Sequence, residues 1–266
     1  MSATPKIAVR GLCKAFPDAR GGVRRVLDHV SFAVADAAFV SIIGPSGCGK
    51  STTLNVIAGL VTPDAGHVDV AGTRVGAGTR QRTRVGYVFQ QPRLLNWLTV
   101  RQNIEFVLEA GEVPRAEWAS RVEAALRLVG LADFHATYPL RLSGGQQQRA
   151  AIARALATDP EVVLMDEPFS HLDEITSARL RTQLMDIWER TRKTILFVTH
   201  DISEAVLLSD RVIVLGRGGT VLADESLELS RPRGVAEDAV FEVERRLRGL
   251  VTRWWTEADD AVEAAR

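Results

Sequence analysis

The sequence has few aromatic residues, only two cysteines, no net charge and no long apolar run. Aromatic residues make up 6% of the 266 residues, which argues against a platform on which nucleic acid bases stack. Lys and Arg total 33, as do Asp and Glu, so no basic excess favours nucleic acid or anionic lipid. Two cysteines, Cys13 and Cys48, exclude a disulfide framework and favour a reducing cytoplasm.

Membrane-spanning and secretory segments are also missing. No run of eighteen or more apolar residues occurs, so we expect the chain not to span a membrane. The first residues, MSATPKIAVRGLCKAF, are polar and charged where a signal peptide needs an apolar stretch. Any role at a membrane is therefore expected to depend on a partner protein.

Short apolar runs alternate with helical patterns along most of the chain. Residues 5–43 have strand character, and the runs EVVLMD and TILFVT are typical of strands buried on both faces. Helix-like stretches follow these strands, which predicts a mostly parallel sheet with crossover helices. Residues 92–140 show no strand pattern and are predicted to be a helical insertion, and residues 231–266 a charged helical tail.

A glycine-rich segment between a strand and a helix predicts a phosphate-binding loop. It fits the pattern G-x-x-x-x-G-K-[ST]. Its glycines allow backbone amides to face a phosphate, and the following helix places positive partial charge at its N-terminus. We expect Lys50 to reach the β- and γ-phosphates and the Ser51 hydroxyl to bind Mg²⁺. The predicted nucleotide contacts here are Gly44, Pro45, Ser46, Gly47, Cys48, Gly49, Lys50, Ser51 and Thr52.

Polar side chains follow three predicted strands. Asp166 and Glu167 end EVVLMD, His200 follows TILFVT, and Gln90 closes RVGYVFQ. Ligands of open α/β sheets bind at the carboxyl ends of the strands, so we expect Asp166 to bind Mg²⁺ and Glu167 to deprotonate the attacking water. His200 is placed to sense a γ-phosphate, and Gln90 to sense Mg²⁺ or the attacking water.

A second anion-binding helix start is predicted at the segment LSGGQ. Ser143 and two glycines immediately precede or begin a helical stretch rich in Ala and Arg. A single nucleotide does not need two such helix starts in one chain. The residues assigned to this segment are Ser143, Gly144, Gly145 and Gln146.

Taken in order, these segments resemble the ABC ATPase family over nearly the whole chain. The resemblance implies an α/β P-loop ATPase core with a mostly parallel sheet, an antiparallel β subdomain and an inserted α-helical subdomain. It implies an ATPase domain at 1–230, with the helical subdomain at about 92–140, and a C-terminal helical tail at 231–266. It also implies that two chains form a head-to-tail homodimer around ATP, in which Ser143 and Gly145 contact the γ-phosphate bound by the other chain. Phe16 is similar to the aromatic residue that stacks on adenine, and Asp173, in Ser170-His171-Leu172-Asp173, lies at the subunit seam.

The finer resemblance is to ATPases of the nitrate, sulfonate and taurine importers. It implies a peripheral subunit at the cytoplasmic face of the membrane, transmembrane permease partners and, indirectly, an extracytoplasmic substrate-binding protein. The sequence departs from the usual family pattern at Ala37-Ala38, where Gly-Glu is common, and at His171, where a small residue is common. Asn96 and Gln147 are smaller departures.

Other functions remain as alternatives. A P-loop kinase or GTPase would have no role for LSGGQ, and the guanine-reading motif N-K-x-D is absent. ABC ATPases that act on DNA or ribosomes tend to carry long coiled coils, paired cassettes or basic insertions, which this sequence lacks. A nucleotide-binding scaffold without hydrolysis would not need Glu167 and His200. An ATPase of another transport system stays open.

Overall fold

The computed structural model describes residues 4–18, 21–76, 85–234 and 237–264, and side chains only as far as residue 252. The chain forms two compact units. Unit 1 comprises Met1–Gln81 and Leu196–Arg266, and unit 2 comprises Arg82–Ile195. Each unit has its own packed secondary structure, and the boundary falls within one strand.

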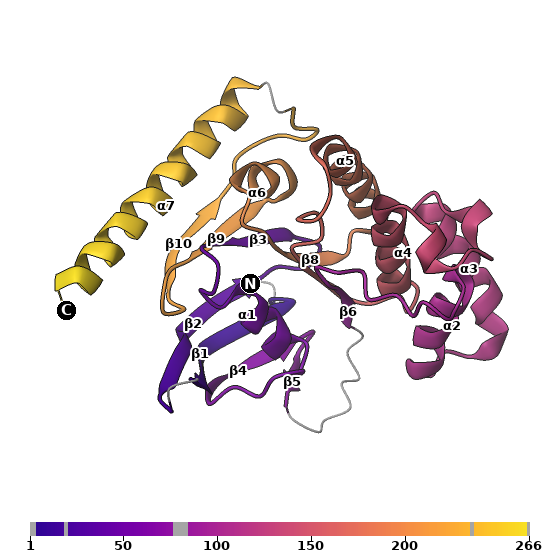
Figure 1. The fold of residues 1–266 in the computed structure, drawn as a ribbon, viewed down its shortest axis with the longest axis horizontal. Coiled ribbons are helices and arrows are strands. Elements are labelled where there is room, and N and C mark those ends of the chain that lie inside the picture. The colour runs from indigo at the N-terminus through magenta and orange to yellow at the C-terminus, as the bar shows by residue number, and fades with distance from the viewer. Residues whose placement is uncertain (1–3, 19–20, 77–84, 235–236, 265–266) are drawn as a thin grey trace. The chain divides into compact units, whose positions relative to one another are not determined.

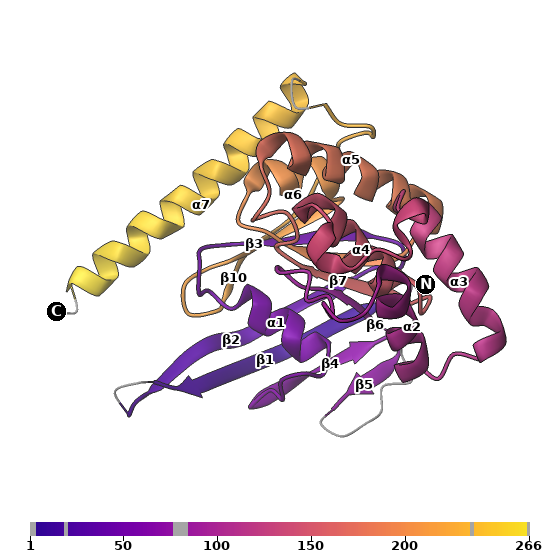
Figure 2. The same ribbon diagram turned by 45° about the vertical axis from the view of Figure 1, so that its right-hand side comes forward.

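Unit 1 contains an antiparallel sheet with the strand order β2-β1-β4-β5 (Figure 1). Its strands are β1 (Ile7–Pro17), β2 (Val23–Val34), β4 (Ala65–Val70) and β5 (Thr73–Val75). The long hairpin of β1 and β2 is in register from Ile7 opposite Val34 to Phe16 opposite Arg24, with irregularities between them. Figure 2 shows α1 (Lys50–Ile57) above this sheet. The antiparallel β subdomain is therefore confirmed.

The part of the second sheet that lies in unit 1 has the strand order β10-β9-β3-β8, and the unit boundary between Ile195 and Leu196 falls within β8. The strands are β3 (Phe39–Ile43), β8 (Thr194–Val198), β9 (Arg211–Leu215) and β10 (Val221–Ser226). β3 runs parallel to β9, and β10 pairs with β9 in the antiparallel direction. Every residue of β3 and β8 is buried, as continuous apolar runs predict for parallel strands covered on both faces.

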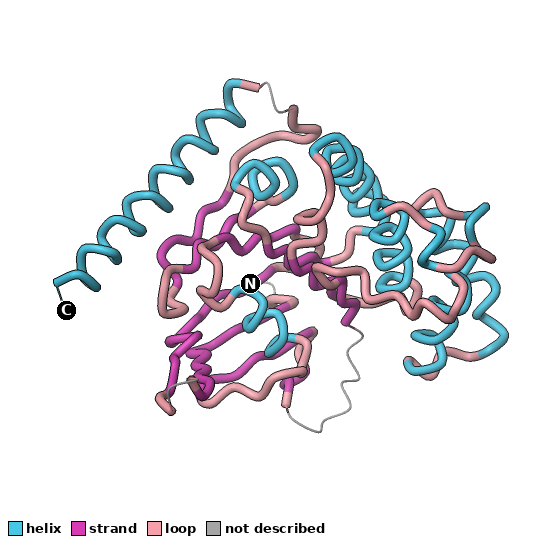
Figure 3. The backbone as a smooth tube through the Cα atoms, viewed as in Figure 1, coloured by secondary structure: helices cyan, strands magenta, loops and turns pink. Residues whose placement is uncertain are grey.

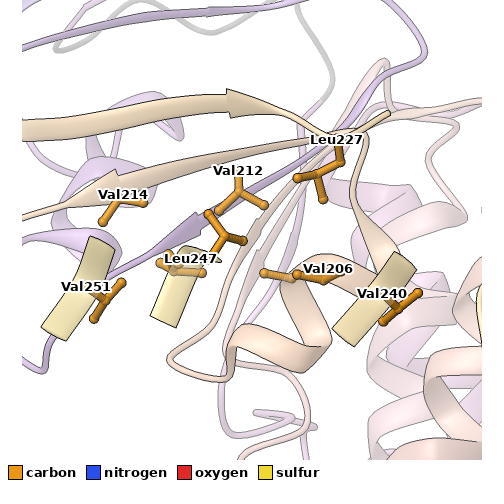
Figure 4. Close-up of a cluster of buried hydrophobic side chains, with 9 residues drawn as sticks. Val206, Val212, Val214, Leu227, Val240, Leu247 and Val251 are labelled. Atoms are coloured by element: carbon orange, nitrogen blue, oxygen red, sulfur yellow. The ribbon is translucent and has the colours of Figure 1, made fainter. Parts of the chain in front are cut away.

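The end of the chain is a long helix that packs on this sheet. α7 (Asp238–Ala264) contacts α6 (Ile202–Leu208). Val240, Leu247 and Val251 of α7 belong to one apolar cluster with residues of α6 and β9 (Figure 4). The Ser203 hydroxyl also donates a hydrogen bond of 2.6 Å to the Glu244 carboxylate. The predicted helical tail is thus a packed helix, although the side chains of its tryptophan pair, at 254–255, lie outside the described residues.

Unit 2 is mostly helical, as Figure 3 shows. Its strands β6 (Val85–Val88) and β7 (Val162–Asp166) are parallel. Its helices are α2 (Val100–Ala110), α3 (Arg115–Leu128), α4 (Gly144–Leu156) and α5 (Glu174–Thr191), with short 3₁₀ turns η1 (Ala132–Phe134) and η2 (Pro139–Arg141). All residues from 92 to 140 are described and none is in a strand, in agreement with the absence of a strand pattern there.

Sequence signals explain where α2 begins and which positions of α3 are buried. Thr99 caps α2 through a capping box with Gln102, which satisfies backbone groups at the helix start. In α3, the apolar positions Val122, Ala125 and Leu126 are the buried ones, as their helical spacing predicts.

The departure at Ala37 has a structural cost. Ala37 lies in the turn between β2 and β3 with φ of 56°, a conformation that glycine adopts without the steric penalty of a Cβ atom. We expect Ala37→Gly to raise the free energy of unfolding by about 0.5–1 kcal/mol, because relief of this penalty exceeds the added freedom of the unfolded chain. Denaturant unfolding measures it, and Ala35→Gly nearby serves as the control that should lose stability.

Candidate functional site

The phosphate-binding loop connects the end of β3 to the start of α1, as predicted. Gly49 has φ of 104° and lies so close to β2 that a Cβ atom there would be 2.5 Å from Leu27 Cδ2 and 2.7 Å from the Val26 carbonyl oxygen. Only glycine meets both requirements. The loop therefore takes its shape from tight packing against β2.

Lys50 is the buried cation of this loop. Its residue is 4% exposed, and its Nζ donates hydrogen bonds to the carbonyl oxygens of Gly44 (2.8 Å) and Pro45 (3.1 Å). The ammonium group thus lies along the loop at the N-terminus of α1, where the helix dipole adds positive potential. A glycine loop, a buried cation and a helix start together suit a phosphate chain.

His200 lies at the same sheet edge as this loop. β3 and β8 are neighbours, and the Thr199 amide donates to the Ile42 carbonyl oxygen at 3.2 Å. The Thr199 hydroxyl donates to the Glu204 carboxylate at 2.6 Å and accepts from the Asp201 amide at 3.0 Å. These bonds fix the turn from which the exposed His200 projects.

Phe16 and Arg24 occupy the end of the β1–β2 hairpin. Phe16 is 37% exposed, and the Lys14 Nζ lies 5.3 Å from the centre of its ring. Arg24 is opposite Phe16 in the strand register, and its guanidinium donates to the Gly47 carbonyl oxygen at 3.4 Å. Arg24 was not predicted as a site residue, since the register that brings it to the loop is not visible in the sequence.

In unit 2, Gln90 and Glu167 are brought together. The Gln90 amide nitrogen donates to the Glu167 carboxylate at 3.5 Å and to the Ser170 hydroxyl at 3.1 Å. Glu167 follows β7 with φ of 42°, an uncommon conformation for this residue type and one that often occurs at functional sites. The Gln90 amide oxygen is the atom that could bind a metal.

Asp166, the last residue of β7, has a neighbour that the sequence did not suggest. Burial, followed by the charge of Asp166 and a side-chain hydrogen bond to it, raises the pKa of Tyr87 well above its usual value. The tyrosine hydroxyl therefore stays protonated and donates a hydrogen bond to the Asp166 carboxylate. Tyr87 is a positioning residue for this carboxylate.

The LSGGQ segment begins α4 as predicted. Ser143 caps the helix and forms a capping box with Gln146. A Cβ atom on Gly145 would be 2.9 Å from Thr176 Cγ2, and one on Gly144 would be 3.3 Å from Leu172 Cδ2. The two glycines thus allow close packing against Leu172 and the first turn of α5, and the approach is tightest at Gly145.

Asp173 caps α5 at this contact. Its carboxylate accepts a hydrogen bond from the Thr176 amide at 2.9 Å, and hydrogen bonds from Thr176 lower its pKa. His171 lines a cavity of about 300 Å³ together with Gln90 and Gly144. The departure at His171 therefore lies where three predicted segments of unit 2 meet.

The predicted site residues divide between the units. Phe16, residues 44–52 and His200 lie in unit 1, and Gln90, residues 143–146, Asp166, Glu167 and Asp173 lie in unit 2. The oxygen donors Ser51, Asp166 and Gln90 are of the type that Mg²⁺ binds.

Residues 27–170 match the family model described as ABC transporter. The chain belongs to the ABC transporter family. It is 42% identical to an uncharacterized ABC transporter ATP-binding protein of Methanocaldococcus jannaschii, over 92% of this chain and 91% of the relative. It is 40% identical to the nitrate import ATP-binding protein of Synechocystis sp., over 90% and 89% of the two chains. It is 47% identical to an aliphatic sulfonates import ATP-binding protein of Xanthomonas axonopodis, over 80% and 84%.

Solved structures agree with this assignment. A dimeric ATP-binding cassette in a post-hydrolysis state, bound to ADP and Pi, is 34% identical and has a TM-score of 0.72, over 86% of this chain and 99% of that one. This ABC transporter ATPase thus has an α/β P-loop fold and hydrolyses ATP. None of its described helices is long and apolar enough to cross a membrane.

Proposed function

We propose that this ATPase powers the import of a small anion or organic acid, of the nitrate, sulfonate or taurine type, through partner permeases. The observation that carries the proposal is that one chain contains two helix starts of the kind that suits anions, at α1 and at the Ser143-capped α4. Relatives named for nitrate and sulfonate import support the substrate class.

The proposed roles involve residues of both units. Lys50 and the loop amides bind the phosphates, and Phe16 stacks on adenine. Arg24 lies opposite Phe16 in the hairpin and contacts the phosphate loop at Gly47. Ser51, Asp166 and Gln90 would supply oxygen ligands to Mg²⁺, Glu167 would act as the general base and His200 would sense the γ-phosphate. Ser143, Gly144, Gly145 and Gln146 contact ATP bound by a second copy, and Asp173 lies at the seam. When bound, Mg²⁺ neutralises phosphate charge.

The division into an ATPase domain at 1–230 and a tail at 231–266 is also a proposal. The apolar contacts of α7 with α6 and β9 support a structural role for the tail. α6 begins directly after His200, and Asp201 caps it, so α7 steadies the helix that follows this histidine.

A growth experiment tests the substrate class. Deletion of the gene from its host should prevent growth on nitrate as the sole nitrogen source, or on an alkanesulfonate or taurine as the sole sulfur source. Restoring the gene should restore growth, and a Lys50→Ala copy should not. Unchanged growth on all three would favour the alternatives, an ATPase of another transport system or one outside transport.

Mg²⁺ binding can be tested through Tyr87. Tyr87→Phe removes the hydroxyl that positions Asp166, and a hydrogen bond to a charged group contributes about 1.5–3 kcal/mol. We expect the ATPase to need at least about tenfold more Mg²⁺ for half-maximal activity. Activity as a function of Mg²⁺ concentration measures this shift. Tyr138→Phe, at the other and exposed tyrosine, is the control, and an unshifted Tyr87→Phe curve would contradict the assignment.

We further propose that permeases dock on the helical segment 92–140. It exposes large apolar side chains, with Trp97 73%, Phe106 53% and Leu140 76% exposed. Large apolar side chains exposed on one segment supply the contact area that a partner protein would cover. The segment directly follows Gln90, so movement of that residue can reach the partner.

Trp97→Ala and Leu140→Asp should abolish co-purification of the permease from membranes. Each removes an apolar side chain outside the ATP-binding residues, so ATPase activity of the isolated protein should stay unchanged. Phe241→Ala, which alters a comparably exposed side chain of α7 (64%), should retain the permease. If both docking variants still retained the permease, this segment would not be the docking surface.

A further inference from the structure

A bulge in the antiparallel sheet of unit 1 brings together three metal-ligating side chains. Leu12 pairs with Val30, and Lys14 pairs with Leu27. Between these pairs, β1 has one residue, Cys13, and β2 has two, Asp28 and His29. Such a bulge changes the direction of side chains relative to a regular ladder, and here both residues of β2 lie next to the cysteine.

The ligand atoms are close. Cys13 Sγ, a carboxylate oxygen of Asp28 and a ring nitrogen of His29 all lie within 4.8 Å of one another. His29 Nδ1 is 2.8 Å from Asp28 Oδ1, and the His29 amide donates to Cys13 Sγ at 3.4 Å. In a tetrahedral zinc site with bonds of about 2.0–2.3 Å, ligand atoms lie roughly 3.3–3.8 Å apart. Because the three ligand atoms already lie within 4.8 Å of one another, side-chain rotations that move them by roughly 1 Å bring them to this spacing.

The cluster is open to solvent. The side chain of His29 is 77% exposed and that of Asp28 is 31% exposed, and Cys13 is half-buried. An ion can therefore reach the three groups, and a water molecule can take a fourth position.

We propose that Cys13, Asp28 and His29 bind a thiophilic divalent transition-metal ion, with Zn²⁺ as the representative ion. Thiolate and imidazole are ligands that Zn²⁺ prefers, whereas Mg²⁺ prefers oxygen ligands. The site is therefore chemically distinct from the one proposed for Mg²⁺. Asp28 follows Val26 and Leu27, which pack against Gly49, so the ion binds one residue beyond the segment that supports the phosphate loop.

One neighbouring cation opposes metal binding. Arg25 lies 3.1 Å from Asp28 Oδ1, so its guanidinium competes with the ion for this carboxylate. Removing that charge should therefore increase the affinity of the site for the metal ion.

Zn²⁺ titration of the full chain, without nucleotide, against a chromophoric chelator measures the affinity. Absorption of the Co²⁺ complex reports a metal–sulfur bond. We expect one ion per chain and a sulfur–cobalt band in the unsubstituted protein. Cys13→Ser and His29→Gln should each weaken Zn²⁺ binding at least about tenfold, and Cys13→Ser should remove the band. Arg25→Gln should strengthen binding.

His135→Gln, which changes another exposed histidine, is the matched control and should bind Zn²⁺ as the unsubstituted protein does. Thermal unfolding of each variant verifies that the fold is retained. A sulfur–cobalt band that persists in Cys13→Ser would assign the thiolate to Cys48 and overturn the proposal. Equal affinity in Cys13→Ser and the unsubstituted protein, or no competition with a chelator of micromolar affinity, would do the same. These readouts do not depend on ATP hydrolysis.

Discussion

Glu167→Gln should nearly abolish ATP turnover while ATP binding is retained. The substitution removes the proposed general base, which contributes about 10²–10⁴ in rate, but keeps the size and hydrogen-bonding shape of the side chain. Gln90, which donates to Glu167, can still bond to the amide oxygen. Steady-state phosphate release should therefore fall at least about a hundredfold.

The same variant should accumulate as a dimer with ATP. Hydrolysis reopens the proposed dimer, so a protein that binds but does not hydrolyse stays closed. Size-exclusion chromatography with ATP measures this, and ADP should leave the protein monomeric. Glu123→Gln, at an exposed ion pair of α3, is the control that retains turnover. A fully active Glu167→Gln protein would refute the assignment as base.

Substitutions of Ser143 should separate helix capping from contact with ATP. Ser143→Arg removes the cap and places a cation at a helix start, which costs about 1 kcal/mol or more. Ser143→Asp keeps a good cap but places a negative charge where the second copy's γ-phosphate is expected. Both variants should lose ATPase activity, whereas only Ser143→Arg should lose thermal stability. Normal ATP turnover by Ser143→Asp would show that Ser143 does not contact the γ-phosphate of the second copy's ATP.

A mixture of variants tests whether two copies share each ATP site. Lys50→Ala and Ser143→Arg should each be inactive alone. When mixed, a head-to-tail dimer contains one complete site, formed by the intact Lys50 of one chain and the intact Ser143 of the other. Recovery of part of the ATPase activity is expected. A mixture as inactive as its components would show that the LSGGQ segment acts within its own chain.

The phosphate loop and the LSGGQ helix start could be predicted because local sequence determines them. The glycines of the loop and Lys50 share one strand-to-helix turn, and Ser143 with Gln146 forms a capping box within four residues. The buried strands β7 and β8 were predicted from the continuous apolar runs EVVLMD and TILFVT. All these signals lie within a few residues.

Contacts between distant segments could not be predicted in this way. Arg24 reaches Gly47 only through the register of the β1–β2 hairpin, and Tyr87 meets Asp166 only because β6 pairs with β7. The three-residue strand β5 and the partly exposed β10 were also missed. Neither has a continuous apolar run, since an edge strand with an accessible face does not need one.

The packing of α7 affects where the protein can be cut for expression. A recombinant fragment that stops at residue 230 lacks the helix that covers Val206, Val212 and Val214. These side chains would then be exposed to water as a contiguous apolar patch, which promotes aggregation. Soluble material for crystallisation or assays therefore requires the C-terminal helix at least through Val251, well past the last predicted nucleotide-binding residue, His200.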